Sequence, residues 1–312
     1  MENPVISIVS TMYHSADYVE LFYLRCRSVL ADLDVDCYEF ILVDDGSPDN
    51  SLELAVNLVK SDSRVTVVEL SRNFGHNKAI ATGLSYARGD YVFLIDMDLE
   101  EPPELLNEFW LKLQAEKSHV DVVYGVQSAR KGNGLERLTG RCYYNVFNWL
   151  SDDFKIEPNI STVRLMKQGF VKSILRFNEE DYYFGAASIV AGFNQVALHF
   201  DKKSHSKTTY DFFKKYRLFF ESVFSFSKKP LYMIFYSGLM LTMGAFFFGA
   251  SLIFRKLFFD ATLSGWTSIM VSIWFLGGII ILFLGVMAIY LAKIFSQTKN
   301  HPFSIVKKEY RQ

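Results

Sequence analysis

Short apolar segments and helical patterns alternate through the first part of the chain. Apolar, β-branched runs predict strands at residues 5–10, 39–43, 65–70, 90–95 and 120–124. Helical spacing of apolar residues predicts helices at residues 18–30, 52–59, 78–87 and 104–116. This alternation favours an α/β fold with a mostly parallel sheet and helices on both faces. Such sheets bind ligands at the carboxyl ends of their strands.

The C-terminal part of the chain has a different pattern. The runs from Leu231 to Phe254 and from Thr267 to Ala292 contain no charged residue. Each is longer than the roughly 18 residues that a helix needs to cross a membrane. We therefore predict two transmembrane helices within residues 231–295, the alternative being two buried helices of a soluble core. Residues 296–312 are expected to form a tail.

Aromatic residues recur at helical spacing just before the first apolar run, with lysines and an arginine between them. This pattern predicts an amphipathic helix at residues 210–230 that lies in the plane of the lipid head groups. The alternative is a helix packed on the sheet. The α/β domain is accordingly expected to occupy residues 1–209.

The distribution of charge predicts an orientation in the membrane. Lys228 and Lys229 precede the first apolar run, whereas Lys293 and Lys299 follow the second. The positive-inside rule therefore places the α/β domain and the C-terminal tail in the cytoplasm, in a multi-pass protein of the inner (cytoplasmic) membrane. The chain starts without the basic segment of a signal sequence, which agrees with this orientation. A net charge of −1 argues against nucleic-acid binding.

Two aspartates follow the fourth predicted strand. Asp96 and Asp98 are separated by one residue, and Glu100 continues the alternation. Two carboxylates at a strand end can bind Mg²⁺ or Mn²⁺ when a diphosphate supplies further oxygen ligands. The simpler interpretation of such a pattern is a solvated turn. Its position between an apolar strand and a Pro-Pro-Glu helix start favours a metal site.

Polar segments also follow the second and third predicted strands. Asp44 and Asp45 precede Gly46, which allows a ligand to approach the backbone closely. The segment 71–78 places Arg72 and Lys78 on either side of a glycine, directly before a helix that can bind phosphate at its N-terminus. Because Asp44-Asp45 and Asp96/Asp98 each follow a strand of one sheet, we expect these two acidic clusters to share a crevice.

The order of these motifs resembles family 2 glycosyltransferases of the GT-A fold. More narrowly, the chain is similar to the polyprenyl-phosphate glycosyltransferases, which include dolichol-phosphate mannose synthase and bacterial undecaprenyl-phosphate sugar transferases. The similar segments are Leu-Ser-Arg-Asn-Phe-Gly at 70–75, Ala-Thr-Gly-Leu at 81–84, the stretch 96–104 and Ser-Phe-Ser-Lys-Lys-Pro-Leu at 225–231. The resemblance covers nearly the whole chain.

The resemblance implies a role for several residues. The donor would be a nucleotide sugar, for which UDP-glucose is our guess, and the acceptor a polyprenyl phosphate. Donor binding is assigned to Thr11, Tyr13, Asp44, Asp45, Arg72, Lys78 and Asp96, and metal binding to Asp96, Asp98 and Glu100. The acceptor phosphate is assigned to Arg130, Arg137 and Lys207, and catalysis to Asp96, Asp98, Arg130 and Arg137. Membrane lipids are expected partners, and a homo-oligomer is left open.

Three positions depart from the family pattern. Ser15 stands where the family has Glu, Gln127 where Arg is common, and Thr162 where some relatives have Asp as a base. A phosphate monoester needs no base, because its second pKa of ~6 leaves it largely dianionic. We therefore expect direct displacement with inversion at the sugar C1, aided by a cationic clamp. The alternatives are transfer to a lipid-diphosphate-linked sugar and an inactive membrane-anchored scaffold protein.

Overall fold

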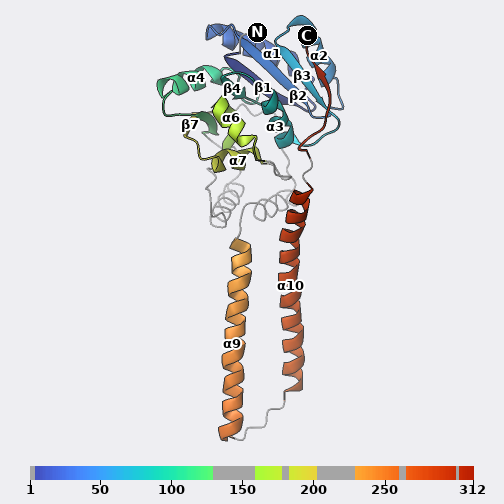
Figure 1. The fold of residues 1–312 in the computed structure, drawn as a ribbon, viewed down its shortest axis with the longest axis vertical. Coiled ribbons are helices and arrows are strands. Elements are labelled where there is room, and N and C mark those ends of the chain that lie inside the picture. Colours follow the sequence, from blue (N-terminus) through green and yellow to red (C-terminus); the bar gives the residue numbers. More distant parts are fainter. Residues whose placement is uncertain (1–3, 129–158, 178–182, 202–228, 260–264, 300–301) are drawn as a thin grey trace. The chain divides into compact units, whose positions relative to one another are not determined.

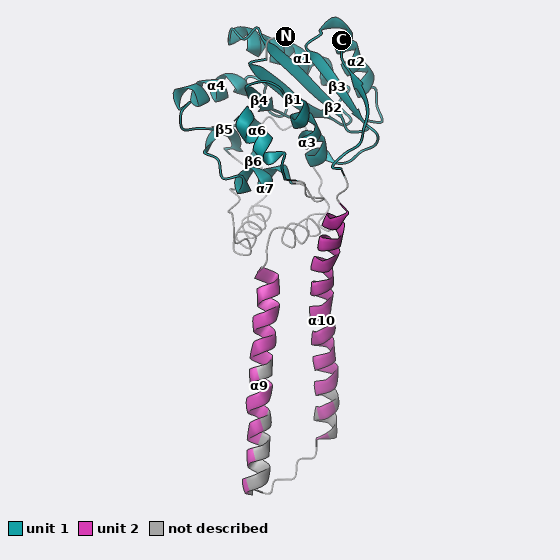
Figure 2. Cartoon of the chain, in the orientation of Figure 1, with its two compact units in different colours: residues 1–144, 154–209, 300–312 teal, residues 145–153, 210–299 magenta. Residues whose placement is uncertain are grey.

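The computed structural model describes residues 4–128, 159–177, 183–201, 229–259, 265–299 and 302–312 (Figure 1). The chain divides into two compact units (Figure 2). The first unit combines residues 1–144, 154–209 and 300–312. The second contains residues 145–153 and 210–299.

The first unit is built on an eight-stranded sheet with the order β7-β5-β6-β4-β1-β2-β3-β8. The strands are β1 (Ile6–Met12), β2 (Tyr38–Asp44), β3 (Val65–Leu70), β4 (Tyr91–Leu94), β5 (Val122–Gln127), β6 (Ile160–Lys167), β7 (Gln195–Phe200) and β8 (Val306–Tyr310). Only β6 and β8 run against the direction of the other strands. The predicted mostly parallel sheet is therefore confirmed, and all five predicted strands are present.

Helices cover both faces of this sheet. They are α1 (Val19–Asp32), α2 (Ser51–Ser61), α3 (His76–Tyr86), α4 (Leu105–Ala115), α6 (Gln168–Ile174) and α7 (Phe184–Val190). One hydrophobic core lies under α1, α2 and α4, and the other under α3, α6 and α7. In β2, Phe40 and Leu42 enter the first core while Ile41 and Val43 enter the second, as the two-residue period of a strand requires.

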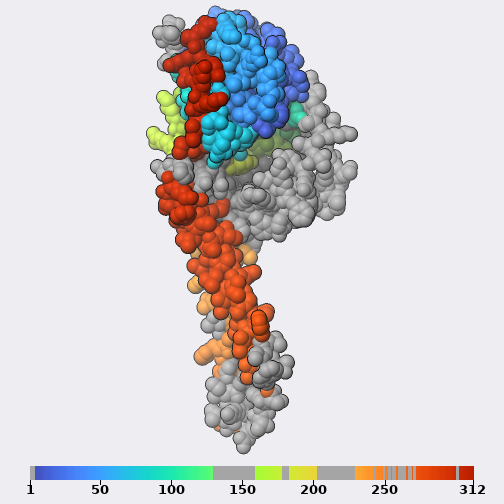
Figure 3. Space-filling view, turned by 90° about the vertical axis from the view of Figure 1, so that its right-hand side faces the viewer, coloured from blue at the N-terminus to red at the C-terminus, as the bar shows by residue number. Residues whose placement is uncertain are grey.

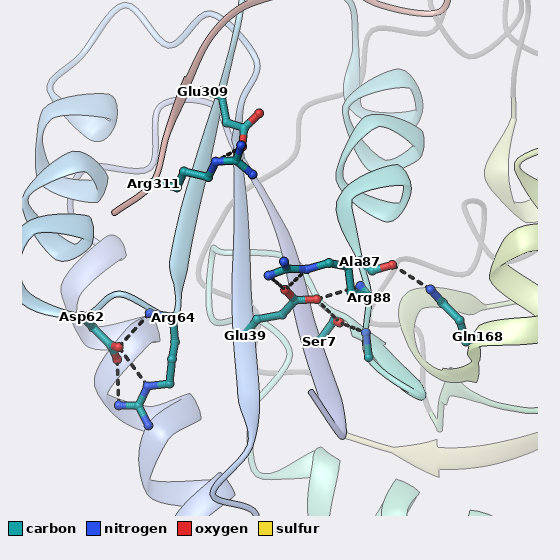
Figure 4. A network of polar contacts seen from close by, with 10 residues as sticks. Ser7, Glu39, Asp62, Arg64, Ala87, Arg88, Gln168, Glu309 and Arg311 are labelled. Carbon is teal, nitrogen blue, oxygen red and sulfur yellow. Dashed lines mark hydrogen bonds and ion pairs between the residues drawn. The ribbon is translucent and has the colours of Figure 1, made fainter. Parts of the chain in front are cut away.

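A buried carboxylate joins the amino-terminal ends of the central strands (Figure 4). Glu39 in β2 is 4% exposed. It accepts hydrogen bonds from the Ser7 hydroxyl at 2.7 Å and from the Arg88 guanidinium at 2.7 Å and 3.0 Å. Gly89 packs closely against this cluster. A β-carbon at this position would lie only 2.7 Å from the Ser7 backbone nitrogen, so glycine is required here. The cluster fixes the start of β4 against β1 and β2, at the sheet edge opposite the strand ends that the sequence marks as functional.

The end of the chain belongs to the sheet, whereas the sequence analysis assigns residues 296–312 to a tail. β8 pairs antiparallel with β3 and forms the edge of the sheet. In Figure 3 this red segment lies on the surface beside blue segments from the first part of the chain. Its sequence, Val-Lys-Lys-Glu-Tyr, lacks the alternation of apolar and polar residues that marks a half-buried strand. Lysines are typical of edge strands, which face solvent. The tail assignment was therefore wrong for Val306–Tyr310.

The second unit contains two long apolar helices, α9 (Lys229–Phe259) and α10 (Trp266–Thr298). They contain the two charge-free runs of the sequence, and both are long and apolar enough to cross a membrane. Large apolar side chains are exposed along them, with Trp274 at 80% and Ile281 at 72%. The predicted amphipathic helix lies outside the described residues except for its last two positions.

Candidate functional site

The carboxyl ends of three neighbouring strands form a small pocket. Its volume is about 120 Å³. The lining residues are Thr11, Met12 and Tyr13 from the end of β1, Asp45 after β2, and Asn73, Gly75 and His76 after β3. The structure thus brings together three of the predicted donor-binding residues, namely Thr11, Tyr13 and Asp45. Neither Asp96 nor Asp98, which were expected to share a crevice with Asp45, lines this pocket.

Asp45 connects the three segments that form the pocket. Its carboxylate accepts hydrogen bonds from the backbone N–H groups of Phe74 at 2.7 Å and Gly75 at 3.0 Å. Its own N–H donates to the Met12 carbonyl at 3.0 Å. Burial raises the pKa of this carboxyl, although the two N–H groups favour the ionised form. Asp45 therefore holds the loop after β3 against the ends of β1 and β2.

Gly46 allows this loop to approach so closely. Its φ is +69°, a conformation that glycine adopts without strain. A β-carbon at this position would lie 2.7 Å from the Asn73 nitrogen and 2.8 Å from the Arg72 carbonyl carbon. Both neighbours are backbone atoms, which cannot rotate away. The turn after β2 can therefore pack on the pocket loop only with glycine at this position.

His76 connects the pocket to the aspartate pair after β4. It is the first residue of α3. Its Nδ1 lies 3.2 Å from the Thr11 hydroxyl, and its Nε2 lies 3.4 Å from Asp96 Oδ1. This histidine belongs to the segment 71–78, but the sequence predicted no role for it. The sequence feature that could have identified it is a histidine directly after the glycine that precedes a helix.

Asp96 and Asp98 follow β4 as predicted. The Glu100 N–H donates to Asp98 Oδ1 at 3.0 Å, and the intervening Leu99 has a φ of +56°. Within the described ranges, no group of three or more histidine, cysteine or acidic side chains is arranged to hold a metal ion. Glu100 is therefore not grouped with Asp96 and Asp98 as a third ligand, and the two aspartates remain the candidates. Carboxylates are ligands that a divalent cation takes together with phosphate oxygens and water.

The other four predicted donor residues, Asp44, Arg72, Lys78 and Asp96, do not line the pocket. Asp44 is 2% exposed, and its carboxylate accepts the Ser47 N–H at 3.3 Å, so it supports the turn from beneath. The Arg72 guanidinium stacks over the Phe74 ring at 4.1 Å, beside the pocket. Lys78 lies in the first turn of α3.

The residues predicted to bind the acceptor are a separate group. They are Arg130, Arg137 and Lys207, which lie outside the described residues.

The fold and the site together define the class of protein. A mostly parallel α/β sheet carries acidic turns and a helix N-terminus at its strand ends, an arrangement of the GT-A type that suits a nucleotide ligand. Residues 7–175, more than half of the chain, match the family described as "Glycosyl transferase family 2". The chain belongs to this family and is a glycosyltransferase.

Similar proteins match almost the full length of the chain. A protein of Mycobacterium tuberculosis (strain CDC 1551 / Oshkosh) assigned to the glycosyltransferases is 42% identical over 98% of this chain and 88% of its own length. The SfII prophage-derived bactoprenol glucosyl transferase of Shigella flexneri is 32% identical over 98% of both chains. Among solved structures, glucosyl-3-phosphoglycerate synthase from Mycobacterium tuberculosis is 19% identical with a TM-score of 0.48, over 72% of this chain and 80% of that one.

Proposed function

We propose that this protein transfers glucose from a nucleotide-diphosphate sugar, with UDP favoured, to a polyprenyl phosphate. One observation carries the proposal. The similarity to a bactoprenol glucosyl transferase covers 98% of both chains, and it therefore includes the two apolar helices as well as the family domain. A glycosyltransferase that shared only its donor chemistry with this relative would not need to match beyond the domain.

The pocket supports a role in donor binding. Asp45 and the backbone of the segment 73–75 offer polar groups to a nucleotide base, and Arg72 lies beside them. The N-terminus of α3 adds N–H groups and a positive partial charge, which favour phosphate. In our proposal Asp45 contacts the base, and Thr11 and Tyr13 contact the rest of the nucleotide.

The aspartate pair supports metal assistance. In our proposal Asp96 and Asp98 hold Mg²⁺ or Mn²⁺ next to the donor diphosphate. The ion would stabilise the negative charge that grows on the departing nucleotide diphosphate. His76 orients Asp96 from the pocket side, so the base site and the aspartate pair are joined by one side chain.

The acceptor would act as the nucleophile. An oxygen of the lipid phosphate forms a bond to C1 of the sugar while the bond from C1 to the donor diphosphate breaks. Because the phosphate is already ionised, no general base is required, and Thr162 can replace the acidic residue of some relatives. One displacement inverts the configuration at C1. We assign alignment of the lipid phosphate to Arg130, Arg137 and Lys207.

The second unit would keep the acceptor within reach. Helices α9 and α10 have the length and composition of membrane spans, and apolar side chains are exposed along both. A hydrocarbon environment would cover these side chains, which water does not favour. Following the basic residues that flank the spans, we place the α/β domain and both ends of the chain on the cytoplasmic side of the inner membrane. The segment 210–230 would lie at the membrane surface.

A product assay tests the proposal. The full-length protein in detergent is incubated with undecaprenyl phosphate, Mn²⁺ or Mg²⁺ and a panel of labelled nucleotide sugars. We expect a label that is extractable into organic solvent with UDP-glucose, and the anomeric configuration of the product should be inverted. Transfer only to a lipid-diphosphate-linked sugar would contradict the acceptor, and absence of turnover with every donor would contradict the proposal as a whole.

A further inference from the structure

The C-terminal strand lies against the segment that leads into the donor pocket. Ser71 is the first residue after β3, and its N–H donates to the Ile305 carbonyl at 2.9 Å. Two positions further along the chain, Asn73 begins to line the pocket. The segment that connects β3 to the pocket is therefore hydrogen-bonded to Ile305, the residue that immediately precedes β8.

The same C-terminal segment contacts the helix that follows the pocket loop. The Ser304 and Thr82 hydroxyls lie 2.6 Å apart. Phe303 packs against the hydrophobic core beneath α3. Thr82 is in α3, the helix that begins with His76. Residues 303–305 thus contact the chain on both sides of the pocket loop.

β8 also supplies the partners of a buried carboxylate. Glu69 in β3 lies directly beside Asp44 in β2, and the two residues are only 7% and 2% exposed. Two carboxylates at adjacent positions of a sheet repel each other. Lys307 donates to Glu69 Oε1 at 2.5 Å, and the Tyr310 hydroxyl donates to Oε2 at 2.8 Å. β8 thus supplies one positive charge and one hydroxyl donor to this carboxylate pair.

The pKa values agree with this arrangement. Burial raises the pKa of Asp44, and the charge of Glu69 adds to this effect. Burial acts on Glu69 in the same direction, but the hydrogen bonds from Lys307 and Tyr310 outweigh it and hold its pKa below the usual value. Without β8, Glu69 would lose both donors next to Asp44. Asp44 directly precedes the pocket residue Asp45 in the chain.

We propose that β8 is a positioning element of the donor pocket, with Lys307 as its decisive side chain. Lys307 balances the Glu69–Asp44 pair and so keeps the ends of β2 and β3 in place. Ile305 and Ser304 hold the loop and α3, which carry the rest of the pocket. This inference rests on the proposed nucleotide-sugar donor. Lys307 is not one of the residues that line the pocket and would act through Asp45 and the loop.

The test compares two neighbouring lysines in the full-length protein in detergent. Lys307→Met removes the partner of Glu69. Lys308→Met makes the same change at the next position, where the lysine acts on Glu69 through its charge and is not one of the two hydrogen-bond donors. The dissociation constant for UDP with Mn²⁺ is measured by calorimetry, together with the donor KM, kcat and the melting temperature.

We expect Lys307→Met to weaken UDP binding and raise the donor KM by about threefold to tenfold, the usual range for a residue that acts indirectly. The kcat should change less than the KM. Lys308→Met should remain within about twofold of the wild type, since small surface changes have small effects. Lys307→Arg keeps the positive charge and should bind UDP as the wild type does. Tyr310→Phe removes the other donor to Glu69 and should weaken UDP binding, as Lys307→Met does.

The outcomes separate the two proposals. Suppose that the wild type binds UDP and that both methionine variants bind it with the same affinity. This result would overturn the role of β8 and leave the proposed function intact. A lower melting temperature in Lys307→Met without any change in UDP affinity would also overturn it, because β8 would then serve stability alone. Absence of binding to any nucleoside diphosphate by the wild type would overturn both proposals.

Discussion

The imidazole of His76 lies between the donor pocket and the aspartate pair, with its Nε2 3.4 Å from Asp96 Oδ1. Its other ring nitrogen lies 3.2 Å from the Thr11 hydroxyl. A side chain with a polar neighbour at each ring nitrogen is restricted in orientation. His76 therefore couples the end of β1 to the turn after β4.

Replacing His76 tests this coupling. In His76→Ala, Asp96 loses the neighbour that orients it. We expect the Mn²⁺ concentration for half-maximal transfer to rise by about tenfold, the lower range for loss of a residue behind a metal ligand. His119→Ala is the matched control, because His119 is exposed after α4. An unchanged Mn²⁺ requirement in His76→Ala would show that Asp96 does not depend on this histidine.

Removing the charge of the aspartate pair tests the metal site. Asp96→Asn and Asp98→Asn should each lower kcat by about 100-fold or more, because an amide holds a divalent cation poorly while the diphosphate departs. The melting temperature should change little, since both side chains are partly exposed at a turn. Asp36→Asn, at an exposed position, serves as the control for loss of one negative charge. Substantial activity in both site variants would exclude this pair as the metal site.

Two glycines with similar backbone angles allow the effect of backbone strain to be distinguished from the effect of a steric clash with neighbouring atoms. Gly46 and Gly192 have φ values of +69° and +70°. A β-carbon on Gly46 would meet the Asn73 nitrogen at 2.7 Å, whereas one on Gly192 would find its nearest neighbour at 3.8 Å. Alanine at either position should destabilise the fold by about 1–2 kcal/mol through backbone strain.

Only Gly46→Ala should also displace the pocket loop. We expect its donor KM to rise by about tenfold, the equivalent of roughly 1.4 kcal/mol, while Gly192→Ala keeps the KM of the wild type. Steady-state kinetics and thermal unfolding of both variants provide the measurement. Equal KM values in the two variants would mean that the contact with Asn73 does not shape the pocket.

An aspartate that is paired with an arginine, away from the pocket, should make stability depend on pH. Burial alone would raise the pKa of Asp62, but hydrogen bonds from Arg64 and Tyr23 outweigh it and lower the pKa to about 2. Because the pKa is lower in the folded state, the stabilisation is present above the unfolded value of 3.8 and is lost as the pH falls towards 2.

Asp62→Asn should therefore reduce the free energy of unfolding at neutral pH. We expect about 1–2 kcal/mol, less than the full shift implies, because the Arg64 side chain is 40% exposed to solvent. The difference from wild type should shrink as the pH falls from about 4 to about 2. Denaturant titrations of the full-length protein across this range measure it. A difference that stays constant with pH would exclude the ionised carboxylate as its source.

Sequence patterns located the site more accurately than they assigned its residues. Apolar runs marked the strands, and polar clusters after them marked the strand ends, where Asp45 lines the pocket and Asp96 lies beside His76. Asp44 and Asp45 are adjacent and chemically alike, however, and only the pairing of β2 with β3 places Asp44 beside Glu69 beneath the turn. His76 was missed because its two partners lie far from it along the chain.

The sequence by itself determined the alternation of strands and helices and the two apolar runs. Both follow from local periodicity and from length, which a chain carries before it folds. The tertiary structure alone decided that Val306–Tyr310 pairs with β3 and that Lys307 meets Glu69. Strand pairing depends on backbone hydrogen bonds, which nearly every residue can make, so distant segments show no mark of their partner until the sheet has formed.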